Sequence, residues 1–421
     1  MDLDLRLGDA RRRYVETHPV SRDWWDRARV VMPGGNTRSV LHYDPFPIRV
    51  TQAEGRFLHD AEGHTYVDLL GNYTAGLFGH SPLGILSAVH KAIDDGVALG
   101  GVAGDEVRLA EALVARFDSI DLIRFTNSGT EANLMAISAA LHHTGRAGVV
   151  VFDGAYHGGV LYFGDHGREV NVPHRWLHAR YNDLESVRSH FESDPDGIGC
   201  ILVEPMQGSA GCIPAEPEFL SGLRTLADRY DALLVFDEVM TSRLSFGGAQ
   251  HLYGVASDLT TLGKYLGGGL GFGAFGGRRT VMKAFDPAAG GGLSHAGTFN
   301  NDVVSMAAGV AAAEHLTPQL LDDLNRRGDR LREALGSVLA RVGMSVSGVG
   351  SLMNVHAVPG PVRSVDDLTA ADDRLLELWF FESLAAGFYP ARRGFIALSL
   401  EVTDGDVDRY VDAVEAALSG L

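Results

Sequence analysis

The sequence predicts an α/β protein that has a large domain with a mainly parallel sheet and a smaller α+β domain. From about residue 83 to residue 302, apolar runs alternate with helical patterns. The runs Gly148–Phe152, Gly199–Val203 and Ala232–Phe236 are continuously apolar, which is typical of strands that are covered on both faces of a parallel sheet. After residue 302 the pattern changes to long helical stretches separated by short strands. In a parallel sheet that is covered on both faces, ligands bind at the carboxyl ends of the strands.

The division into domains follows from this change of pattern. We expect residues 1–65 to form the N-terminal part of the smaller domain, residues 66–305 the larger domain and residues 306–421 the rest of the smaller domain. Gly290–Gly292 is the obvious flexible point. The helices expected after residue 302 cover about residues 303–316, 319–342, 366–386 and the stretch from 404 onward, and the strands cover 351–357 and 394–400.

Composition excludes several classes of protein. The chain has 421 residues, with 36 Lys and Arg against 54 Asp and Glu, and the resulting net charge of −18 argues against a nucleic-acid binder. Its two cysteines, Cys200 and Cys212, cannot build a disulfide framework and lack zinc-ligand spacing, so we expect no metal. The N-terminus is too acidic for a secretory signal, and no apolar run is long enough to cross a membrane. We therefore expect a soluble cytoplasmic protein.

Residues 125–133 predict an anion-binding helix start. An apolar stretch ends there, a Ser-Gly-Thr turn follows, and Ser128 and Glu131 fit a capping box. Gly129 allows a ligand close to the backbone, while the hydroxyls of Ser128 and Thr130 flank free helix N–H groups, as in a phosphate site. The motif lacks the lysine of a P-loop, so a nucleotide is disfavoured. A merely well-capped helix is the alternative.

Two charged residues follow apolar strands. Asp237 ends the run that starts at residue 233, and a buried carboxylate needs a cationic partner, for which a ring nitrogen is a candidate. Lys264 stands between an apolar run and the glycines 267–269, where burial favours a neutral amine that can form a Schiff base. Surface charge is the alternative for each residue.

Tyr156 and His157 lie in a glycine-rich turn after the strand that ends at Phe152. Aromatic rings in such a turn can lie flat on a planar cofactor, and core packing explains them equally well. The combination of a phosphate cup, an aromatic pair, a strand-end Asp237 and a buried Lys264, in this order, matches the needs of pyridoxal phosphate.

The chain resembles the class III aminotransferases, which have the fold-type I architecture of pyridoxal-phosphate enzymes. The resemblance extends over nearly the whole chain. It implies a Schiff-base lysine, a homodimer with shared sites, and small-molecule substrates, an amino donor and a keto acid. The motifs that carry it are Asn127–Ala132, Tyr156–Gly158, Glu204-Pro205, Asp237–Thr241 and Leu262–Lys264.

Within this class the chain is similar to glutamate-1-semialdehyde aminomutases, for example at residues 273–278, but it departs from them at residues 242–244 and 299–302. These variants, together with residues 36–40 and 393–395, look closer to the aromatic β-amino acid aminotransferases such as the β-phenylalanine enzymes.

The resemblance implies roles for individual residues. Lys264 forms the Schiff base and moves the proton, and Asp237 keeps the pyridine nitrogen protonated. Thr298 reaches the phosphate of the other subunit's cofactor. The residues expected around the cofactor are Ser128, Gly129 and Thr130 at the phosphate, Tyr156 and Val239 on the two ring faces, Glu204 near the ring hydroxyl, and His157 and Met240.

Arginines are the best anchors for a substrate carboxylate because they bind it through two hydrogen bonds. Arg38 and Arg393 are the candidates. Arg392 is adjacent to Arg393, and the sequence leaves open which of these two arginines faces the site. Tyr73 is a candidate for an apolar substrate pocket or for core packing.

The leading hypothesis is an aminotransferase that moves the amino group of an aromatic β-amino acid to 2-oxoglutarate or pyruvate. The alternatives are an intramolecular aminomutase of the glutamate-1-semialdehyde type and a catalytically silent scaffold that binds phosphate or nucleotides.

Overall fold

The computed structural model describes residues 3–164, 168–289 and 292–421. Gly290 and Gly291, at the predicted flexible point, lie outside these residues. The chain forms two compact units, which we call the terminal unit and the central unit. The terminal unit comprises Met1–Pro82, Leu324–Val362 and Asp367–Leu421, and the central unit comprises Leu83–Asp323 and Arg363–Asp366. The predicted domains 1–65, 66–305 and 306–421 are different ranges and stay a prediction.

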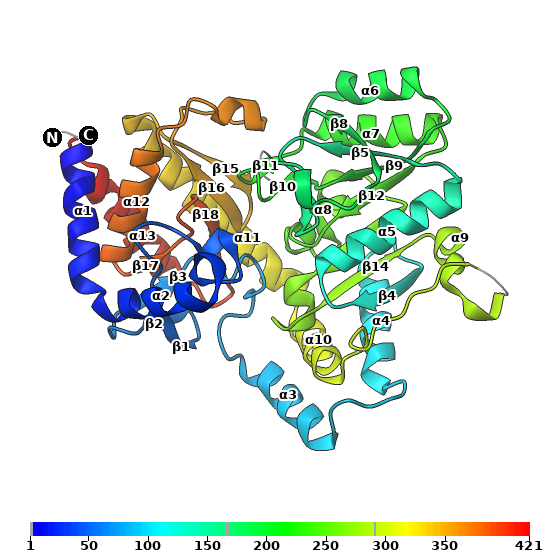
Figure 1. Ribbon diagram of the computed structural model, residues 1–421, viewed down its shortest axis with the longest axis horizontal. Coiled ribbons are helices and arrows are strands. Elements are labelled where there is room, and N and C mark those ends of the chain that lie inside the picture. The colour runs from blue at the N-terminus through cyan, green and yellow to red at the C-terminus, as the bar shows by residue number, and fades with distance from the viewer. Residues whose placement is uncertain (1–2, 165–167, 290–291) are drawn as a thin grey trace. The chain divides into compact units, whose positions relative to one another are not determined.

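The central unit is built on a seven-stranded sheet (Figure 1). Strand β14 (Gly273–Gly277) runs antiparallel to both of its neighbours, β13 (Leu259–Gly263) and β4 (Leu122–Thr126), and the other pairs are parallel. This confirms the predicted, mainly parallel sheet. In spatial order the strands are β4 (Leu122–Thr126), β14 (Gly273–Gly277), β13 (Leu259–Gly263), β12 (Leu233–Asp237), β9 (Ile198–Val203), β5 (Gly148–Phe152) and β8 (Arg175–Ala179).

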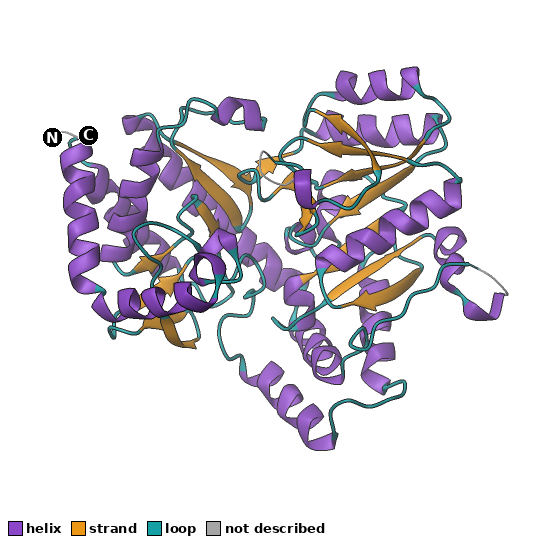
Figure 2. Cartoon of the chain, viewed as in Figure 1, coloured by secondary structure: helices purple, strands orange, loops and turns teal. Residues whose placement is uncertain are grey.

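Helices cover both faces of this sheet (Figure 2). The chain crosses the sheet in one direction through α5 (Gly129–Thr144) and in the opposite direction through α6 (Leu184–Ser193) and α7 (Pro217–Arg229). Because such crossovers are right-handed, α5 lies on one face of the sheet, and α6 and α7 lie on the other face. The helices of this unit are α3 (Leu83–Asp95), α4 (Gly104–Arg116), α5 (Gly129–Thr144), α6 (Leu184–Ser193), α7 (Pro217–Arg229), α8 (Gly248–Tyr253), α9 (Arg279–Met282) and α10 (Val303–His315). Short strands also form two ribbons, β6 (Tyr156–Gly158) with β7 (Leu161–Tyr162) and β10 (Met206–Gln207) with β11 (Ile213–Pro214).

The terminal unit combines helices with two small sheets, around a core that includes Trp379, Phe380 and Tyr410. One sheet contains β1 (Val50–Glu54), β2 (Phe57–Asp60), β3 (Thr65–Asp68) and β17 (Phe388–Tyr389), and the other contains β15 (Ser345–Val349), β16 (Leu352–His356) and β18 (Phe395–Ala397). The helices are α1 (Leu3–Thr17), α2 (Pro19–Val31), α12 (Asp373–Ala385) and α13 (Asp404–Leu418), while α11 (Pro318–Leu339) begins in the central unit and continues into this one.

Two helix starts in this unit show where the sequence pattern is decisive. The predicted start of α13 is confirmed, because the Thr403 side chain accepts from the Asp406 N–H and Asp406 returns the bond in a capping box. The predicted helix over residues 366–386 is wrong at its start, because α12 begins at Asp373, where the Asp372 side chain caps it. Across the described ranges, every helix is too short or too polar to cross a membrane.

Candidate active site

Side-chain hydrogen bonds cap the N-terminus of α5. Ser128 has extended backbone angles, and its side chain accepts a hydrogen bond from the Glu131 N–H at 3.2 Å. Glu131 in turn accepts from the Asn127 N–H at 2.9 Å. The N–H groups of Gly129 and Thr130 have no carbonyl partner within the helix, as at every helix start. Because the Ser128 hydroxyl accepts in the cap, its hydrogen can still be donated to an anion.

Three other segments meet this helix start. A Cβ added to Gly129 would lie 2.8 Å from Val239 Cγ2, and one added to Gly263 would lie 3.2 Å from Val239 Cγ1. The Val239 side chain is therefore packed between the helix start and the end of β13. From β6 and its turn, the Gly159 N–H donates to Thr130 Oγ1 at 3.2 Å. The predicted phosphate cup, the strand end after Asp237 and the Tyr156 turn thus lie together.

Lys264 follows directly on the end of β13, and its φ of +57° lies in the left-handed region. A non-glycine residue in that region costs energy and is found where the surroundings hold it in place. The hydroxyl of its neighbour Tyr265 accepts from Arg116 Nη2 at 2.8 Å. Arg116 also donates to the carbonyls of Ser242 at 2.7 Å and Phe246 at 2.6 Å. This buried arginine, which the sequence did not single out, anchors the turn that begins at Lys264.

Asp237 is the last residue of β12 and is buried. Its Oδ2 accepts from Asn133 Nδ2 at 2.8 Å and lies 2.7 Å from His157 Nδ1, which donates because an ionised carboxylate can only accept. Its Oδ1 accepts from the Val239 N–H at 3.0 Å. Asn133 is itself held by Thr261 Oγ1, which donates to Asn133 Oδ1 at 2.8 Å. Two sheet strands and α5 therefore fix the carboxylate.

Asn133 and Thr261 had no predicted role, although a signal for Asn133 exists in the sequence. Asn133 is an amide in the mainly apolar stretch that opens α5, and it is buried. Since buried polar groups are almost always hydrogen-bonded, an amide at such a position predicts a buried polar partner. Thr261 carries no comparable signal, because threonine is common in strands.

Glu204 follows β9 and is also buried. Its Oε1 accepts from the Tyr156 N–H at 3.0 Å and its Oε2 from the Gly208 N–H at 2.9 Å. Burial raises the pKa of Glu204 to about 7, and the nearby His157 opposes that rise. The Tyr156 side chain stays 46% exposed, so its ring is accessible to a ligand. Met240 packs over Gly208, where an added Cβ would lie 2.4 Å from its Cε.

In the terminal unit, the two predicted arginines converge on one aromatic ring. Arg38 Cζ lies 5.6 Å and Arg393 Cζ 5.0 Å from the centroid of the Tyr73 ring, within cation–π range. The ring stacks on Phe395 with centroids 5.4 Å apart, and Arg38 Nη1 donates to Asn72 Oδ1 at 2.7 Å. Burial raises the pKa of Tyr73, and both arginines oppose that rise. Two guanidinium groups beside one ring form a site that suits a carboxylate.

Arg392 faces a different group of side chains. Its Nη2 lies 2.6 Å from Asp373 and 3.1 Å from Glu377, both on α12. Glu377 also accepts from Arg11 Nη2 at 2.8 Å. Arg392 is therefore neutralised by acidic side chains, and of the two neighbouring arginines it is Arg393 that lies at Tyr73.

Thr298 is exposed, and it lines a cavity of about 520 Å³. Leu99, Val102 and Phe299 line the same cavity, and each exposes more than half of its surface. In the described part of the chain, no hydrogen bond joins Thr298 to Ser128, Gly129 or Thr130. Thr298 is therefore not tied by a hydrogen bond to the phosphate cup of its own chain.

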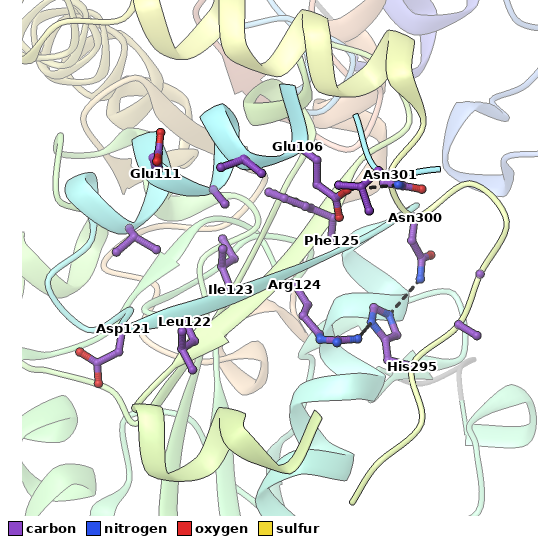
Figure 3. A pocket seen from close by; sticks show the side chains of 16 residues that line it. Glu106, Glu111, Asp121, Leu122, Ile123, Arg124, Phe125, His295, Asn300 and Asn301 are labelled. Carbon is purple, nitrogen blue, oxygen red and sulfur yellow. Dashed lines mark hydrogen bonds between the residues drawn. The ribbon is translucent and has the colours of Figure 1, made fainter. Parts of the chain in front are cut away.

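A larger cavity, of about 790 Å³, lies between α4, β4 and the segment that leads to Thr298 (Figure 3). In the figure Asn300 points toward His295, and their side-chain nitrogens are 3.1 Å apart. The Asn300 Oδ1 accepts from Asn127 Nδ2 at 3.1 Å, next to the phosphate cup. The cavity is lined by neither Lys264 nor Asp237, so it is not the centre of the candidate active site.

Comparison with known proteins decides the family. Residues 39–373 match the family model "Aminotransferase class-III". The chain belongs to the class III aminotransferases. This aminotransferase is 50% identical to a beta-phenylalanine transaminase of Variovorax paradoxus, over 99% of the chain and 97% of the relative. It is 35% identical to a glutamate-1-semialdehyde 2,1-aminomutase of Acetivibrio thermocellus, over 93% of the chain and 95% of the relative.

A solved structure supports the same assignment. The aminotransferase superposes on a beta-phenylalanine aminotransferase from Variovorax paradoxus with a TM-score of 0.97, at 50% identity and with coverage of 100% of this chain and 98% of the other. The predicted fold class is therefore confirmed, as is the predicted membership of the transaminases.

Proposed function

We propose that this aminotransferase transfers the amino group of an aromatic β-amino acid, such as β-phenylalanine, to 2-oxoglutarate or pyruvate, with pyridoxal phosphate as its cofactor. The observation that carries the proposal is the 50% identity to a beta-phenylalanine transaminase over essentially the whole length of both chains. The aminomutase similarity is lower, at 35% identity.

The residues of the central unit fit pyridoxal phosphate. The Asp237 carboxylate is buried, and among the described residues its ionic contact is to His157 rather than to a lysine or arginine. Its Oδ1 accepts from Val239 N–H and retains a lone pair for a protonated ring nitrogen. Ser128, Gly129 and Thr130 at the start of α5 would hold the phosphate.

The cofactor and the residues of the chain would have separate roles in the reaction. When bound, pyridoxal phosphate supplies a ring that takes up the electrons released as the C–H bond beside the substrate amine breaks. The Nζ atom of Lys264 would take the proton from that carbon and deliver it to the cofactor carbon on the other side of the amine nitrogen. Asp237 keeps a positive charge on the ring nitrogen, and Asn133 and His157 keep Asp237 in position. Tyr156 offers an accessible ring for stacking.

For the substrate we propose carboxylate binding by Arg38 and Arg393, with Tyr73 between them. In a β-amino acid the amine-bearing carbon is one carbon further from the carboxylate than in an α-amino acid, so its anchor must differ in position. Two arginines around one ring can bind a carboxylate while the ring packs against an aromatic side chain.

We further propose a cytoplasmic homodimer in which Thr298 serves the cofactor phosphate of the partner. Leu99, Val102 and Phe299 are exposed and line one cavity together with Thr298. They support an interface, since monomeric proteins rarely leave such groups together on the surface.

An assay with purified protein and added pyridoxal phosphate tests the substrate. We expect amino transfer from β-phenylalanine to a keto acid, and no turnover when the keto acid is omitted. Turnover of glutamate-1-semialdehyde without any acceptor would instead assign the aminomutase activity. Absence of cofactor binding altogether would assign the silent scaffold.

A further inference from the structure

A cluster of potential metal ligands lies in the terminal unit, apart from every residue named in the proposed reaction. His18 stands at the junction of α1 and α2, Asp60 is the last residue of β2, and His64 stands in the turn before β3. One ligand atom from each lies within 4.8 Å of the others. His18 and Asp60 are buried, whereas His64 is partly exposed.

The hydrogen bonds of His18 fix its tautomer. Its Nδ1 lies 2.8 Å from the Tyr14 carbonyl and 2.9 Å from Thr17 Oγ1. The Thr17 hydroxyl donates its hydrogen to the Arg13 carbonyl at 2.8 Å, so toward His18 it can only accept. Both neighbours of Nδ1 are therefore acceptors, and Nδ1 carries the proton. In a neutral ring, Nε2 then presents a lone pair.

That lone pair faces other electron-rich atoms. His18 Nε2 lies 3.0 Å from the Tyr66 hydroxyl and 3.5 Å from Asp60 Oδ2, and the Tyr66 hydroxyl lies 2.9 Å from Asp60 Oδ2. One hydroxyl hydrogen cannot serve both the ring nitrogen and the carboxylate. When the hydroxyl donates to Asp60, the Nε2 lone pair of His18 stays available to a cation.

We propose that His18 Nε2, Asp60 Oδ2 and His64 Nδ1 bind a divalent transition-metal ion of the Zn²⁺ class. Two imidazoles and one carboxylate are a donor set that such ions favour over Mg²⁺ or Ca²⁺. His64 Nδ1 is 2.8 Å and His18 Nε2 is 3.5 Å from Asp60 Oδ2, and these separations bracket the roughly 3.3 Å between ligands of a tetrahedral Zn²⁺ ion. The exposed side of His64 leaves room for a water ligand.

The groups around the cluster already orient the three ligands. The Tyr14 carbonyl accepts the Nδ1 proton of His18, and the Tyr66 hydroxyl donates to Asp60 Oδ2. The other oxygen of Asp60 accepts from the backbone N–H groups of Glu62 at 3.0 Å and His64 at 2.8 Å. Such outer contacts are typical of metal sites. The bound ion ties the α1–α2 junction to the β2–β3 turn and stabilises the terminal unit.

Co²⁺ titration of the metal-stripped full-length holoenzyme tests the site, with Zn²⁺ as the competitor. We expect one equivalent of Co²⁺ to give the visible absorption of a tetrahedral complex and Zn²⁺ to remove it. His64→Gln, on a partly exposed side chain, is expected to weaken Zn²⁺ binding by at least about 100-fold and Tyr66→Phe by about tenfold. His59→Gln, in the same hairpin but outside the cluster, is the matched control and is expected to bind as the wild type does.

Circular dichroism and unchanged amino transfer confirm that each variant is folded. His18→Gln provides a second ligand variant, with the same expected loss as His64→Gln. Undetectable Co²⁺ and Zn²⁺ binding by the wild type, or binding that survives both His18→Gln and His64→Gln, would overturn the proposal.

Discussion

The two candidate binding regions of this aminotransferase are built in different ways. In the central unit, Asp237 and Lys264 stand at the ends of neighbouring parallel strands, and buried hydrogen bonds hold the surrounding groups. In the terminal unit, Arg38 and Arg393 are long side chains that lie beside the Tyr73 ring, and Arg38 also donates to Asn72.

This difference shows that the fold fixes the groups expected at the cofactor more firmly than the groups expected at the substrate carboxylate. A carboxylate fixed by Asn133, His157 and the Val239 backbone can hold only one geometry, as a cofactor shared by a whole family requires. Long arginine side chains can be repositioned by few substitutions, as a change of substrate requires. We expect variants in the first region to abolish turnover and variants in the second to change substrate affinity.

The largest effect is expected for Lys264→Ala. Without the amine that moves the proton, the amino-transfer rate should fall by at least about 10⁴-fold. Lys283→Ala is the matched control, because Lys283 is an exposed lysine of the same unit, and its rate should stay at the wild-type level. Single-turnover kinetics with β-phenylalanine measures both. More than a few per cent of wild-type turnover in Lys264→Ala would show that another group moves the proton.

A somewhat smaller loss is expected for Asp237→Asn. The amide keeps the size of the side chain but removes the charge that stabilises a protonated ring nitrogen, so kcat should fall about 10²–10³-fold. Asp258→Asn is a useful contrast, since this buried carboxylate pairs with Arg224 and Arg278. Its loss should lower the melting temperature and leave kcat nearly unchanged. Equal kcat losses in the two variants would remove the special role of Asp237.

Glu204 should make the stability of the central unit depend on pH. Its folded pKa of about 7 lies above the ordinary 4.5, so the folded state keeps the proton to higher pH than the unfolded state does. The resulting stabilisation is complete below about pH 4.5 and is lost as the pH rises to about 7, by about 3 kcal/mol. Urea unfolding of the cofactor-free protein at several pH values, with Glu204→Gln as the reference, measures it. A parallel pH dependence in both proteins would contradict this account.

The smallest effects are expected in the terminal unit. Arg38→Lys and Arg393→Lys each replace a two-pronged carboxylate contact by a single point charge, which should raise KM for the β-amino acid about 10–100-fold with little change in kcat. Arg392→Lys is the adjacent control, because Arg392 pairs with Asp373 and Glu377. A larger effect of Arg392→Lys on KM than of Arg393→Lys would reverse the assignment of the two arginines.

Much of the central unit follows from the sequence for physical reasons. Gly148–Phe152 is continuously apolar because β5 is buried on both faces, and β5 covers the predicted residues. Ser128 is the predicted cap of α5, and its contact to the Glu131 N–H confirms it. The rest of the predicted capping box is wrong, because Glu131 accepts from the Asn127 N–H rather than from that of Ser128. Short-range patterns of this kind specify the strand ends at which Asp237 and Lys264 stand.

Other features depend on contacts between distant residues, which no local pattern encodes. Arg392 and Arg393 are equivalent in the sequence until α12 places Asp373 and Glu377 beside one of them. Arg116 lies far along the chain from Tyr265, and only the packed fold joins them.

We propose that Lys264 is the residue that binds the cofactor covalently. Borohydride reduction of the holoenzyme, followed by proteolysis and peptide mass spectrometry, tests this role. We expect a pyridoxyl-phosphate mass on the peptide that contains Lys264 and its absence in Lys264→Ala. A label on another lysine, or an unlabelled Lys264 peptide from protein that retains cofactor, would contradict it.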